Sequence, residues 1–324
     1  MAIFPRLLPL LAAPLILAAA SPGDGDFALE ALRAEDARVA AVAYRIAVGN
    51  RDLCPRQSPW FGLVVHELRQ YAPRYRPAAA RVFDLGPGPA VELVVPGAAA
   101  DRAGMRAGDR IVAINGVKIA ITPLKKREKT DYSGVERVMA RLANASRAGP
   151  VRVTLERAGA LVDHDITPER GCRSQVQLET ADANNAGADG MMISIGVEAA
   201  AAAKDDDELA VSIAHEMAHN ILNHRRRLDR AGVSLDERSP SPDGAREIRK
   251  TEDEADLLGL YLMARAGFDI HVAPAYWERL SGAGDATHAG GAERRAMTQA
   301  IVDDIDGKRA RGEALVPPIA IPEF

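Results

Sequence analysis

The sequence has few aromatic residues, few cysteines and no basic excess. Only 4% of its 324 residues are aromatic and two are cysteine, so neither a disulfide scaffold nor a cysteine-rich zinc knuckle can hold the fold together. The 41 basic and 45 acidic side chains give a net charge of −4, which disfavours sequence-independent nucleic-acid binding. Because 47% of the residues are hydrophobic, the chain can bury two cores and is not expected to be disordered.

The first twenty residues have the pattern of an export signal. Arg6 provides a positive flank, residues 7–20 are apolar, and Ala18-Ala19-Ala20 precedes Ser21 as a small-residue cleavage site. The apolar run is shorter than the ~20 residues that span a bilayer, although an uncleaved anchor is the alternative. No later segment is apolar enough to cross a membrane. We therefore expect removal of residues 1–20 and a periplasmic or secreted protein with no membrane span.

The two cysteines gain a structural role if the protein is exported. In an oxidising compartment, Cys54 and Cys172 can form one disulfide that joins the start of the middle segment to its end. The alternative is two buried free thiols, because the sequence does not show whether the two Cα atoms lie within bridging distance. We prefer the disulfide.

Composition divides the rest of the chain into three parts. Residues 21–58 contain an amphipathic helical pattern, residues 59–170 alternate β-branched runs with glycine and proline, and residues 171–324 return to long helical patterns. The expected fold is therefore α+β. The predicted strands are 90–95, 110–114 and 151–155, and the predicted helices are 27–48, 133–145, 207–224, 245–266, 273–280 and 293–311.

Residues 94–116 carry the most specific pattern of the middle part. They read Val-Val-Pro-Gly-Ala-Ala-Ala-Asp-Arg-Ala-Gly-Met-Arg-Ala-Gly-Asp-Arg-Ile-Val-Ala-Ile-Asn-Gly, and the final Asn-Gly suits a type I′ hairpin turn. This stretch resembles the bacterial PDZ domain. The resemblance implies a second PDZ helix at 133–145 and binding of extended peptides at a sheet edge. Phe61-Gly62-Leu63 is either the loop that receives a peptide carboxylate or an ordinary turn, and the sequence favours neither.

The predicted helix 207–224 contains His215-Glu216-Met217-Ala218-His219. Histidines four positions apart share a helix face, so both rings can bind one zinc ion while Glu216 reaches the attacking water. The flanking residues are apolar, which predicts a buried helix in which two unpaired histidines would be costly. Two hydrogen-bonded structural histidines are the alternative. We expect Arg225-Arg226-Arg227 to stabilise the C-terminal end of this helix.

A catalytic zinc site needs a third protein ligand and one open position. In metzincins a third histidine follows at a fixed spacing, and that position is Arg225 here. His224 lies one residue before it, so the metzincin pattern is not met. A later predicted helix offers Glu252 and Asp256, which lie four residues apart and share a face. One can bind the metal while the other accepts a hydrogen bond from a ligand histidine. Glu254 is expected on a different face.

These paired motifs resemble the gluzincin metallopeptidases of the CAAX prenyl protease and HtpX type, and in particular their soluble periplasmic branch. In that family a helical His-Glu-x-x-His precedes Glu-x-x-Ala-Asp on a later helix. The resemblance covers about residues 176–310 and implies a mostly helical zincin-like domain, with a small edge-strand sheet at 185–195 along which substrate lies extended. It implies one Zn²⁺ ion with three ligands, His215, His219 and Glu252, and a supporting role for Asp256.

Two features depart from the family pattern. The 32 residues between His219 and Glu252 form a shorter connection than the family has, so we expect a reduced lid over the cleft. The family's late His-Pro is here His288-Ala289, followed by Arg294. We expect His288 or Arg294 to donate to the developing oxyanion, with a solvent-exposed loop histidine as the alternative for His288.

The sequence therefore predicts a secreted zinc endopeptidase. Glu216 acts as the general base, and the PDZ domain binds or regulates protein substrates, with unfolded envelope proteins as one class. The alternatives are a non-catalytic, metal-containing PDZ protein that binds or chaperones envelope proteins, and a zinc hydrolase that acts on other substrates. Glu216 favours catalysis, because a structural metal site needs no general base. His66, His164 and His271 have no partner motif and are interpreted as ordinary residues.

Overall fold

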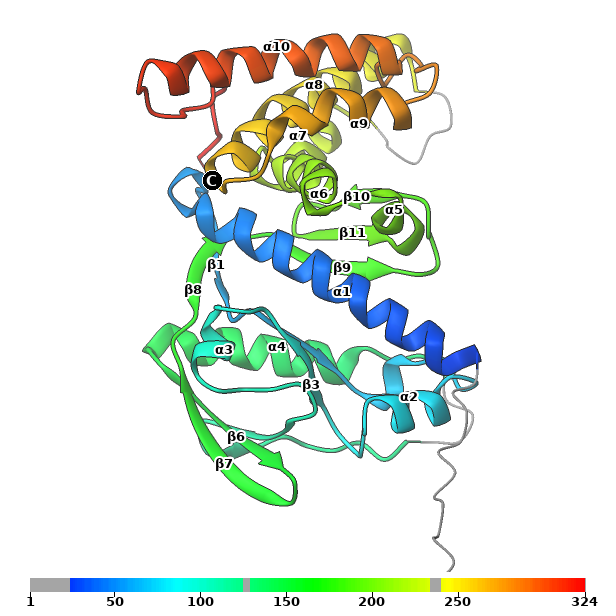
Figure 1. Ribbon diagram of the computed structural model, residues 1–324, viewed down its shortest axis with the longest axis vertical. Helices are drawn as coiled ribbons and strands as arrows, with labels where there is room; N and C mark the ends of the chain where they lie inside the picture. The colour runs from blue at the N-terminus through cyan, green and yellow to red at the C-terminus, as the bar shows by residue number, and fades with distance from the viewer. Residues whose placement is uncertain (1–23, 125–128, 234–239, 324) are drawn as a thin grey trace, which may run out of the picture.

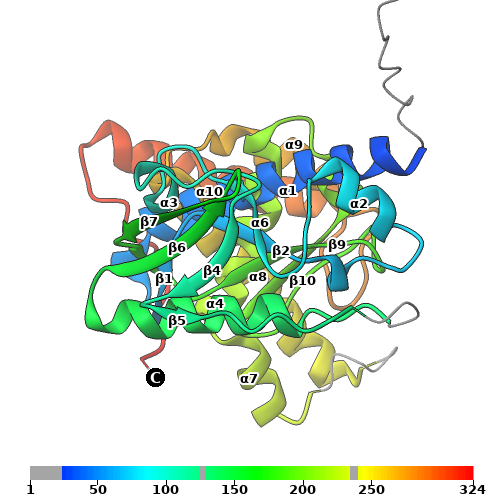
Figure 2. The ribbon, with the colours of Figure 1, turned by 90° about the horizontal axis from the view of Figure 1, so that it is seen from below.

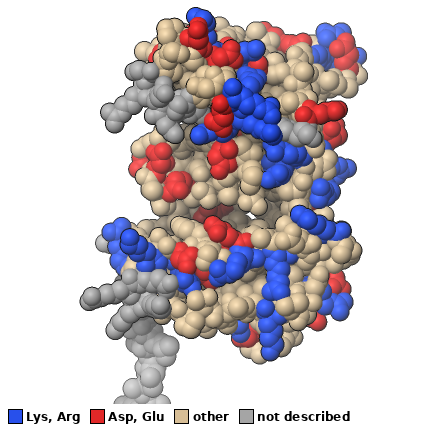
Figure 3. All heavy atoms as spheres, turned by 180° about the vertical axis from the view of Figure 1, so that it is seen from behind, with Lys and Arg blue, Asp and Glu red and all other residues tan. Residues whose placement is uncertain are grey.

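The computed structural model describes residues 24–124, 129–233 and 240–323. These residues form a fold of mixed helices and strands arranged in two lobes (Figure 1), which confirms the predicted mixed class. A hollow separates the two lobes on the face seen in Figure 3. The predicted signal, residues 1–20, lies outside the described residues. Within the described ranges, no helix is both long and apolar enough to span a membrane.

The lower lobe in Figure 1 is built on an antiparallel sheet with the strand order β2-β3-β4-β6-β7, and β5 pairs with β4. Helix α4 (Ser133–Ala145) packs against this sheet, as Figure 2 shows from below. The predicted strands and the predicted helix of this lobe are confirmed. The strands are β2 (Leu63–His66), β3 (Ala90–Val94), β4 (Arg110–Ile114), β5 (Val117–Lys118), β6 (Val151–Arg157) and β7 (Ala160–Ile166), and the short helices are α2 (Arg76–Val82) and α3 (Ala99–Arg102).

The upper lobe is mostly helical. Its small sheet has the order β10-β11-β9, in which β10 pairs antiparallel and β9 parallel with β11. The strands are β9 (Gln175–Glu179), β10 (Ala186–Ala188) and β11 (Met192–Gly196). The helices are α5 (Val197–Ala202), α6 (Asp206–Ile221), α7 (His224–Arg230), α8 (Pro242–Arg265), α9 (Ala273–Leu280) and α10 (Gly291–Ala310).

Helix α1 (Asp24–Gly49) runs between the lobes and belongs to the core of the upper one (Figure 1). Its buried aliphatic face, which includes Val39, Val42 and Ile46, lies in the same hydrophobic cluster as α6 and α8. The helix also contacts β3 and α2 of the lower lobe. The helix predicted at 27–48 is therefore confirmed, and it serves as a packing surface for both lobes.

Helices α6 and α8 cross closely inside the upper lobe. The side chain of Asp205 caps the N-terminus of α6 by accepting a hydrogen bond from the Glu208 N–H (2.9 Å). At the crossing point, a Cβ added to Gly259 of α8 would lie 3.1 Å from the backbone nitrogen of His215. Glycine therefore permits the close approach that brings the polar residues of both helices to one site.

The predicted helix 207–224 ends earlier than expected. Helix α6 stops at Ile221, and Asn223 adopts the left-handed conformation with φ of 57°, which asparagine tolerates better than most residues. A new helix, α7, begins at His224. We expected Arg225-Arg226-Arg227 to stabilise the C-terminal end of the helix that carries His215 and His219. This expectation is wrong, because these arginines lie in α7.

A two-stranded ribbon connects the lobes. Strand β1 (Gln57–Trp60) pairs antiparallel with β8 (Glu169–Cys172). Cys54 and Cys172 form a disulfide at its end, with their Cα atoms 5.2 Å apart, so the predicted bridge is confirmed. It closes the chain around the whole lower lobe, with a sequence separation of 118 residues.

We expect removal of this disulfide to destabilise the protein, because the bridge restricts the unfolded chain over a long loop. The double variant Cys54→Ser/Cys172→Ser should lose about 2–4 kcal/mol of unfolding free energy, measured by urea denaturation under non-reducing conditions. Adding reductant to this variant is the control and should change nothing. Equal stability of the variant and the wild type would contradict a structural role for the bridge.

Candidate metal centre

Three predicted ligands lie together where α6 crosses α8. Nε2 of His215 lies 3.1 Å from Nε2 of His219 and 3.2 Å from Oε2 of Glu252. Nε2 of His219 lies 3.5 Å from Oε1 of Glu252. One donor atom from each residue lies within 4.8 Å of the others. The structure thus brings these three residues to a single point from two separate helices.

The remaining ring nitrogens already have partners. Nδ1 of His215 lies 2.9 Å from Oδ1 of Asp256, and Nδ1 of His219 lies 2.9 Å from Nδ1 of His224. If both Nδ1 atoms carry the proton, both Nε2 atoms direct lone pairs toward each other and toward the Glu252 carboxylate. Two imidazole nitrogens and a carboxylate oxygen are the donors that Zn²⁺ takes in catalytic sites, so this set fits the ion.

The carboxylates next to His215 alter its protonation. Burial disfavours the imidazolium, but hydrogen bonds to Asp256 and Glu252 outweigh burial and raise the pKa of His215 to about 10. Burial likewise opposes ionisation of Glu252, yet His215 and His219 hold the pKa of this carboxyl well below its usual range. Without a metal ion, a proton on His215 therefore supplies the positive charge that balances the carboxylates of Glu252 and Asp256.

Asp256 is held by Arg294, which is only 7% exposed. Arg294 donates from Nε to Oδ2 of Asp256 (2.7 Å) and from Nη2 to Oδ1 (2.6 Å). Its guanidinium also stacks on the ring of Trp277, with Cζ 3.3 Å from the ring centroid. The predicted residues Arg294, Asp256 and His215 thus form one connected chain of contacts.

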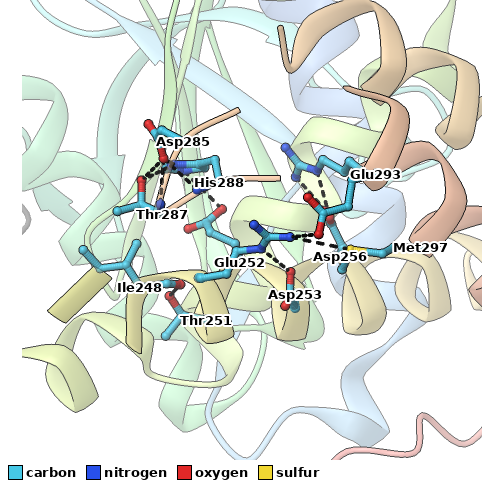
Figure 4. Close-up of polar contacts among 12 residues, drawn as sticks. Ile248, Thr251, Glu252, Asp253, Asp256, Asp285, Thr287, His288, Glu293 and Met297 are labelled. Carbon is cyan, nitrogen blue, oxygen red and sulfur yellow. Dashed lines mark hydrogen bonds and ion pairs between the residues drawn. The ribbon is translucent and has the colours of Figure 1, made fainter. Parts of the chain in front are cut away.

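Glu216 and His288 have different surroundings. Glu216 lies on α6 between the two histidines and is 9% exposed. His288 comes from the loop before α10, and its Nε2 lies 3.6 Å from Oε2 of Glu252 (Figure 4). A turn holds this loop, since Oδ1 of Asp285 accepts hydrogen bonds from the backbone nitrogens of Thr287 and His288 at 2.7 and 2.9 Å. His288 is therefore half exposed but directed at the ligand set.

A pocket of about 380 Å³ adjoins the site. Trp277, Leu280, His288 and Arg294 contribute to its lining. Because His288 and Arg294 also contact the ligand carboxylate and the Asp256 carboxylate, respectively, the pocket opens next to the proposed metal position. Its mixed aromatic and polar walls can take a side chain of a bound chain.

Asn220 of α6, which sequence reasoning did not single out, connects this helix to the small sheet by hydrogen bonds. Its Oδ1 accepts a hydrogen bond from the backbone N–H of Gly190 (2.7 Å), and its Nδ2 donates to Oγ of Ser174 (2.6 Å). Asn220 is only 3% exposed and follows His219 directly. It therefore fixes the hairpin that carries the edge strand β10 beside the histidines.

His224 and Glu254 were also not assigned to the site by sequence reasoning. His224 is 1% exposed. Its Nε2 lies 3.2 Å from Oε2 of Glu254, which also accepts a hydrogen bond from Arg227 (2.5 Å). Burial lowers the pKa of His224 to about 4 despite the carboxylate, so its ring is neutral near pH 7. The asparagine before His224 was the available signal for a chain reversal that brings it back to His219.

Phe61 and Gly62 lead into β2 at the edge of the lower sheet. Gly62 has a φ of 68°, and a Cβ added there would lie 2.1 Å from the Cβ of Ala98. The carbonyl of Gly62 accepts a hydrogen bond from Val95 (2.8 Å), and that of Phe61 accepts one from Ala100 (2.9 Å). The two carbonyls are thus engaged by the residue after β3 and by α3. Among the described residues, the Gly62 N–H has no backbone acceptor.

Comparison with known proteins identifies a family match in the lower lobe. The family model described as PDZ domain matches residues 91–133, a range that begins within β3, contains β4 and ends where α4 begins. The fold and this match define the lower lobe as a PDZ domain. The metal-site residues lie outside the matched range, and no curated protein matches the chain.

Two solved structures each match 36% of the chain. One is the HtrA-type protease AlgW with a decapeptide, at 24% identity and a TM-score of 0.24. The other is the PDZ domain of HtrA3 bound to a phage-derived ligand, at 20% identity and a TM-score of 0.25. The match spans only 30% of the AlgW chain but 89% of the HtrA3 domain. At such TM-scores these likenesses carry no argument about function.

The protonation of His215 predicts proton release on zinc binding. At pH 7 zinc must displace the proton from this ring, so about one proton should be released per zinc ion, and apparent affinity should rise with pH between 6 and 8. Calorimetric titration in buffers with different ionisation enthalpies measures this number. Asp256→Asn removes the main partner that raises the pKa and should release fewer protons. Zinc binding by the wild type without proton release would contradict the assigned protonation.

Proposed function

We propose that the protein is an exported zinc endopeptidase of the gluzincin class, with a PDZ domain that binds protein substrates or regulates their cleavage. The observation that supports this most is the convergence of two Nε2 atoms and a carboxylate while both Nδ1 atoms are engaged elsewhere. A zinc ion there supplies Lewis acidity, which polarises a carbonyl and makes water acidic near neutral pH. The protein's own residues supply the remaining steps.

Glu216 is the proposed general base. It lies between the two histidines on α6, and none of the described residues forms a hydrogen bond or ion pair with its carboxylate. It is therefore free to take a proton from the attacking water and pass it to the leaving amine. The two other acidic side chains at the site, Glu252 and Asp256, are both engaged with histidines.

His288 and Arg294 fit separate roles. Arg294 uses Nε and Nη2 to hold Asp256, which suits a residue that positions His215. His288 is half exposed and directs Nε2 toward the ligand carboxylate, so it is the better candidate to donate a hydrogen bond to the oxyanion. It also lines the adjoining pocket, so a substrate bound there would lie next to it.

Strand β10 offers the substrate a place to pair. It lies at the outer edge of its three-stranded sheet, and it packs against the metal-site helix α6. An extended chain can add to such an edge through backbone hydrogen bonds, which presents peptide bonds to the site with little dependence on sequence. Unfolded proteins of the envelope are therefore the proposed substrate class.

The PDZ domain is the proposed docking module. Strand β2 is the edge strand of its sheet, and the Gly62 N–H at its start lacks a backbone acceptor. A peptide that pairs with β2 would therefore bring its terminal carboxylate to this N–H.

Replacing the general base should abolish turnover without loss of metal. We expect Glu216→Gln to bind zinc as the wild type does and to cleave casein at least about 100-fold more slowly. Zinc content by elemental analysis and the rate of casein cleavage measure the two parts. The matched control is Glu247→Gln, the same change at an exposed position of α8, which should leave both values unchanged.

The same experiment separates catalysis from a metal-containing binding or chaperone function. A wild type that binds zinc but never cleaves casein or another unfolded protein would favour the binding function. Chelator-sensitive activity that persists in Glu216→Gln would contradict the role given to this residue.

The PDZ groove should recognise a free C-terminus. We expect a peptide from a pool of hydrophobic-ended hexapeptides to bind at least about tenfold more tightly than its C-terminally amidated form, because the loop N–H pairs with a carboxylate. Fluorescence anisotropy measures both affinities. Gly62→Ala should weaken binding, since the added Cβ collides with Ala98, whereas Gly97→Ala, also at positive φ but in open space, is the control. Equal binding of both peptide forms would contradict the assignment.

A further inference from the structure

His224 stands at the far side of His219 from the proposed metal position. Nε2 of His219 faces His215 and Glu252 at 3.1 and 3.5 Å, while Nδ1 of the same ring lies 2.9 Å from Nδ1 of His224. The two rings are nearly perpendicular, with centroids 4.8 Å apart. The contact therefore joins ring edges through nitrogen atoms.

One tautomer assignment satisfies every nitrogen in this row. A neutral imidazole has one N–H and one acceptor nitrogen, so a His219 ring that offers Nε2 to a metal must carry its proton on Nδ1. Nδ1 of His224 must then be the acceptor, and His224 must carry its proton on Nε2. That proton points to Oε2 of Glu254 at 3.2 Å, and a carboxylate is an acceptor only. Glu254 at the end of the row thus determines both tautomers.

The backbone explains why these residues meet. On a continuous helix, His224 would lie on a different face from His219, because five residues turn the chain by well over one full turn. The left-handed Asn223 ends α6 and begins α7, which turns His224 back toward His219. Glu254, two residues after the ligand Glu252 on α8, reaches the same place from the opposite side.

We propose that His224 is a positioning residue that fixes the ring of His219, with Glu254 as its anchor, so that His219 presents Nε2 to the metal. The inference rests on the proposed zinc site. It gives each ligand histidine its own support: Asp256 and Arg294 hold His215, and His224 and Glu254 hold His219. Partners of this kind commonly contribute 10–100-fold to metal affinity.

Matched substitutions of His224 separate the hydrogen bond from simple packing. The side-chain oxygen in His224→Asn can take the place of Nδ1 as acceptor, whereas His224→Leu fills a similar volume without an acceptor. We expect the zinc dissociation constant, measured by competition with a chromophoric chelator, to rise about 10–100-fold in His224→Leu and less than about threefold in His224→Asn. His271→Leu is the control and should match the wild type, because this exposed histidine pairs with Asp269 and Asp306 and with no residue of the row.

A double-mutant cycle tests the anchor. Glu254→Leu should weaken zinc binding, and the double variant His224→Leu/Glu254→Leu should be no weaker than His224→Leu alone, because both changes interrupt one row of contacts. Additive losses would contradict the shared role.

Nuclear magnetic resonance of the ring nitrogens gives a readout that needs no variant. In the zinc-loaded wild type, His219 should carry a slowly exchanging proton on Nδ1 and His224 a proton on Nε2. Zinc bound through Nδ1 of His219, or equal losses in His224→Leu and His224→Asn, would overturn the inference. Failure of the wild type to bind zinc would instead overturn the proposed function itself.

Discussion

The arrangement of the upper lobe depends on two imidazole rings, the buried His215 and the partly buried His219, whose Nε2 atoms face each other. Their Nε2 atoms lie 3.1 Å apart, which is unfavourable for two lone pairs unless a proton or a cation lies between the neighbouring groups. The Nδ1 atoms cannot relieve this, because Asp256 and His224 occupy them. A cation held by both rings and by Glu252, as proposed, would resolve the conflict. Without one, the raised pKa of His215 keeps a proton on that ring.

The residues around this pair of histidines hold the two rings in position. Gly259 lets α8 approach α6 closely enough for Glu252 to reach both rings. Asn220, next to His219, ties the same helix to the hairpin that carries β10. The edge strand β10 and the two histidines are therefore attached to one helix, an arrangement that would suit the proposed peptide hydrolysis.

The PDZ lobe is joined to this scaffold by more than a flexible linker. The loop at Gly62 lies beside Tyr44 of α1, and Nε1 of Trp60 donates a hydrogen bond to the carbonyl of Cys172 (3.0 Å). Two residues later in the chain, Ser174 accepts the hydrogen bond from Asn220. The segment that leaves the ribbon at Cys172 thus reaches α6 through Ser174, and the disulfide closes the end of the ribbon.

The predictable part of the molecule is the part encoded by local pattern. Helical periodicity located α1 and α9, β-branched runs located the strands of the PDZ lobe, and motif spacing located His215, His219 and Glu252. The break at Asn223 was not predicted; the expected helix continued to His224, followed by three arginines as its C-terminal cations. Because Asn223 is left-handed and ends α6, the three arginines lie in α7 instead.

The contacts that the sequence did not predict are all long-range or follow from that break. His224 was not taken as a third metal ligand because it lies one residue short of the metzincin spacing. Glu254 was set aside because it does not share a face with Glu252 and Asp256. Asn220 gave no signal, since its partners Gly190 and Ser174 are distant in the chain. The positions of these side chains depend on how helices and hairpins pack against each other. The spacing of residues along one helix or strand does not determine that packing.

X-ray absorption at the zinc edge, on purified protein reconstituted with one equivalent of metal, tests the account most directly. We expect two imidazole nitrogens at about 2.0–2.1 Å together with light oxygen ligands in a four-coordinate environment. A spectrum without an imidazole signature, or protein that fails to retain zinc after reconstitution, would contradict the convergence of His215, His219 and Glu252 on one ion.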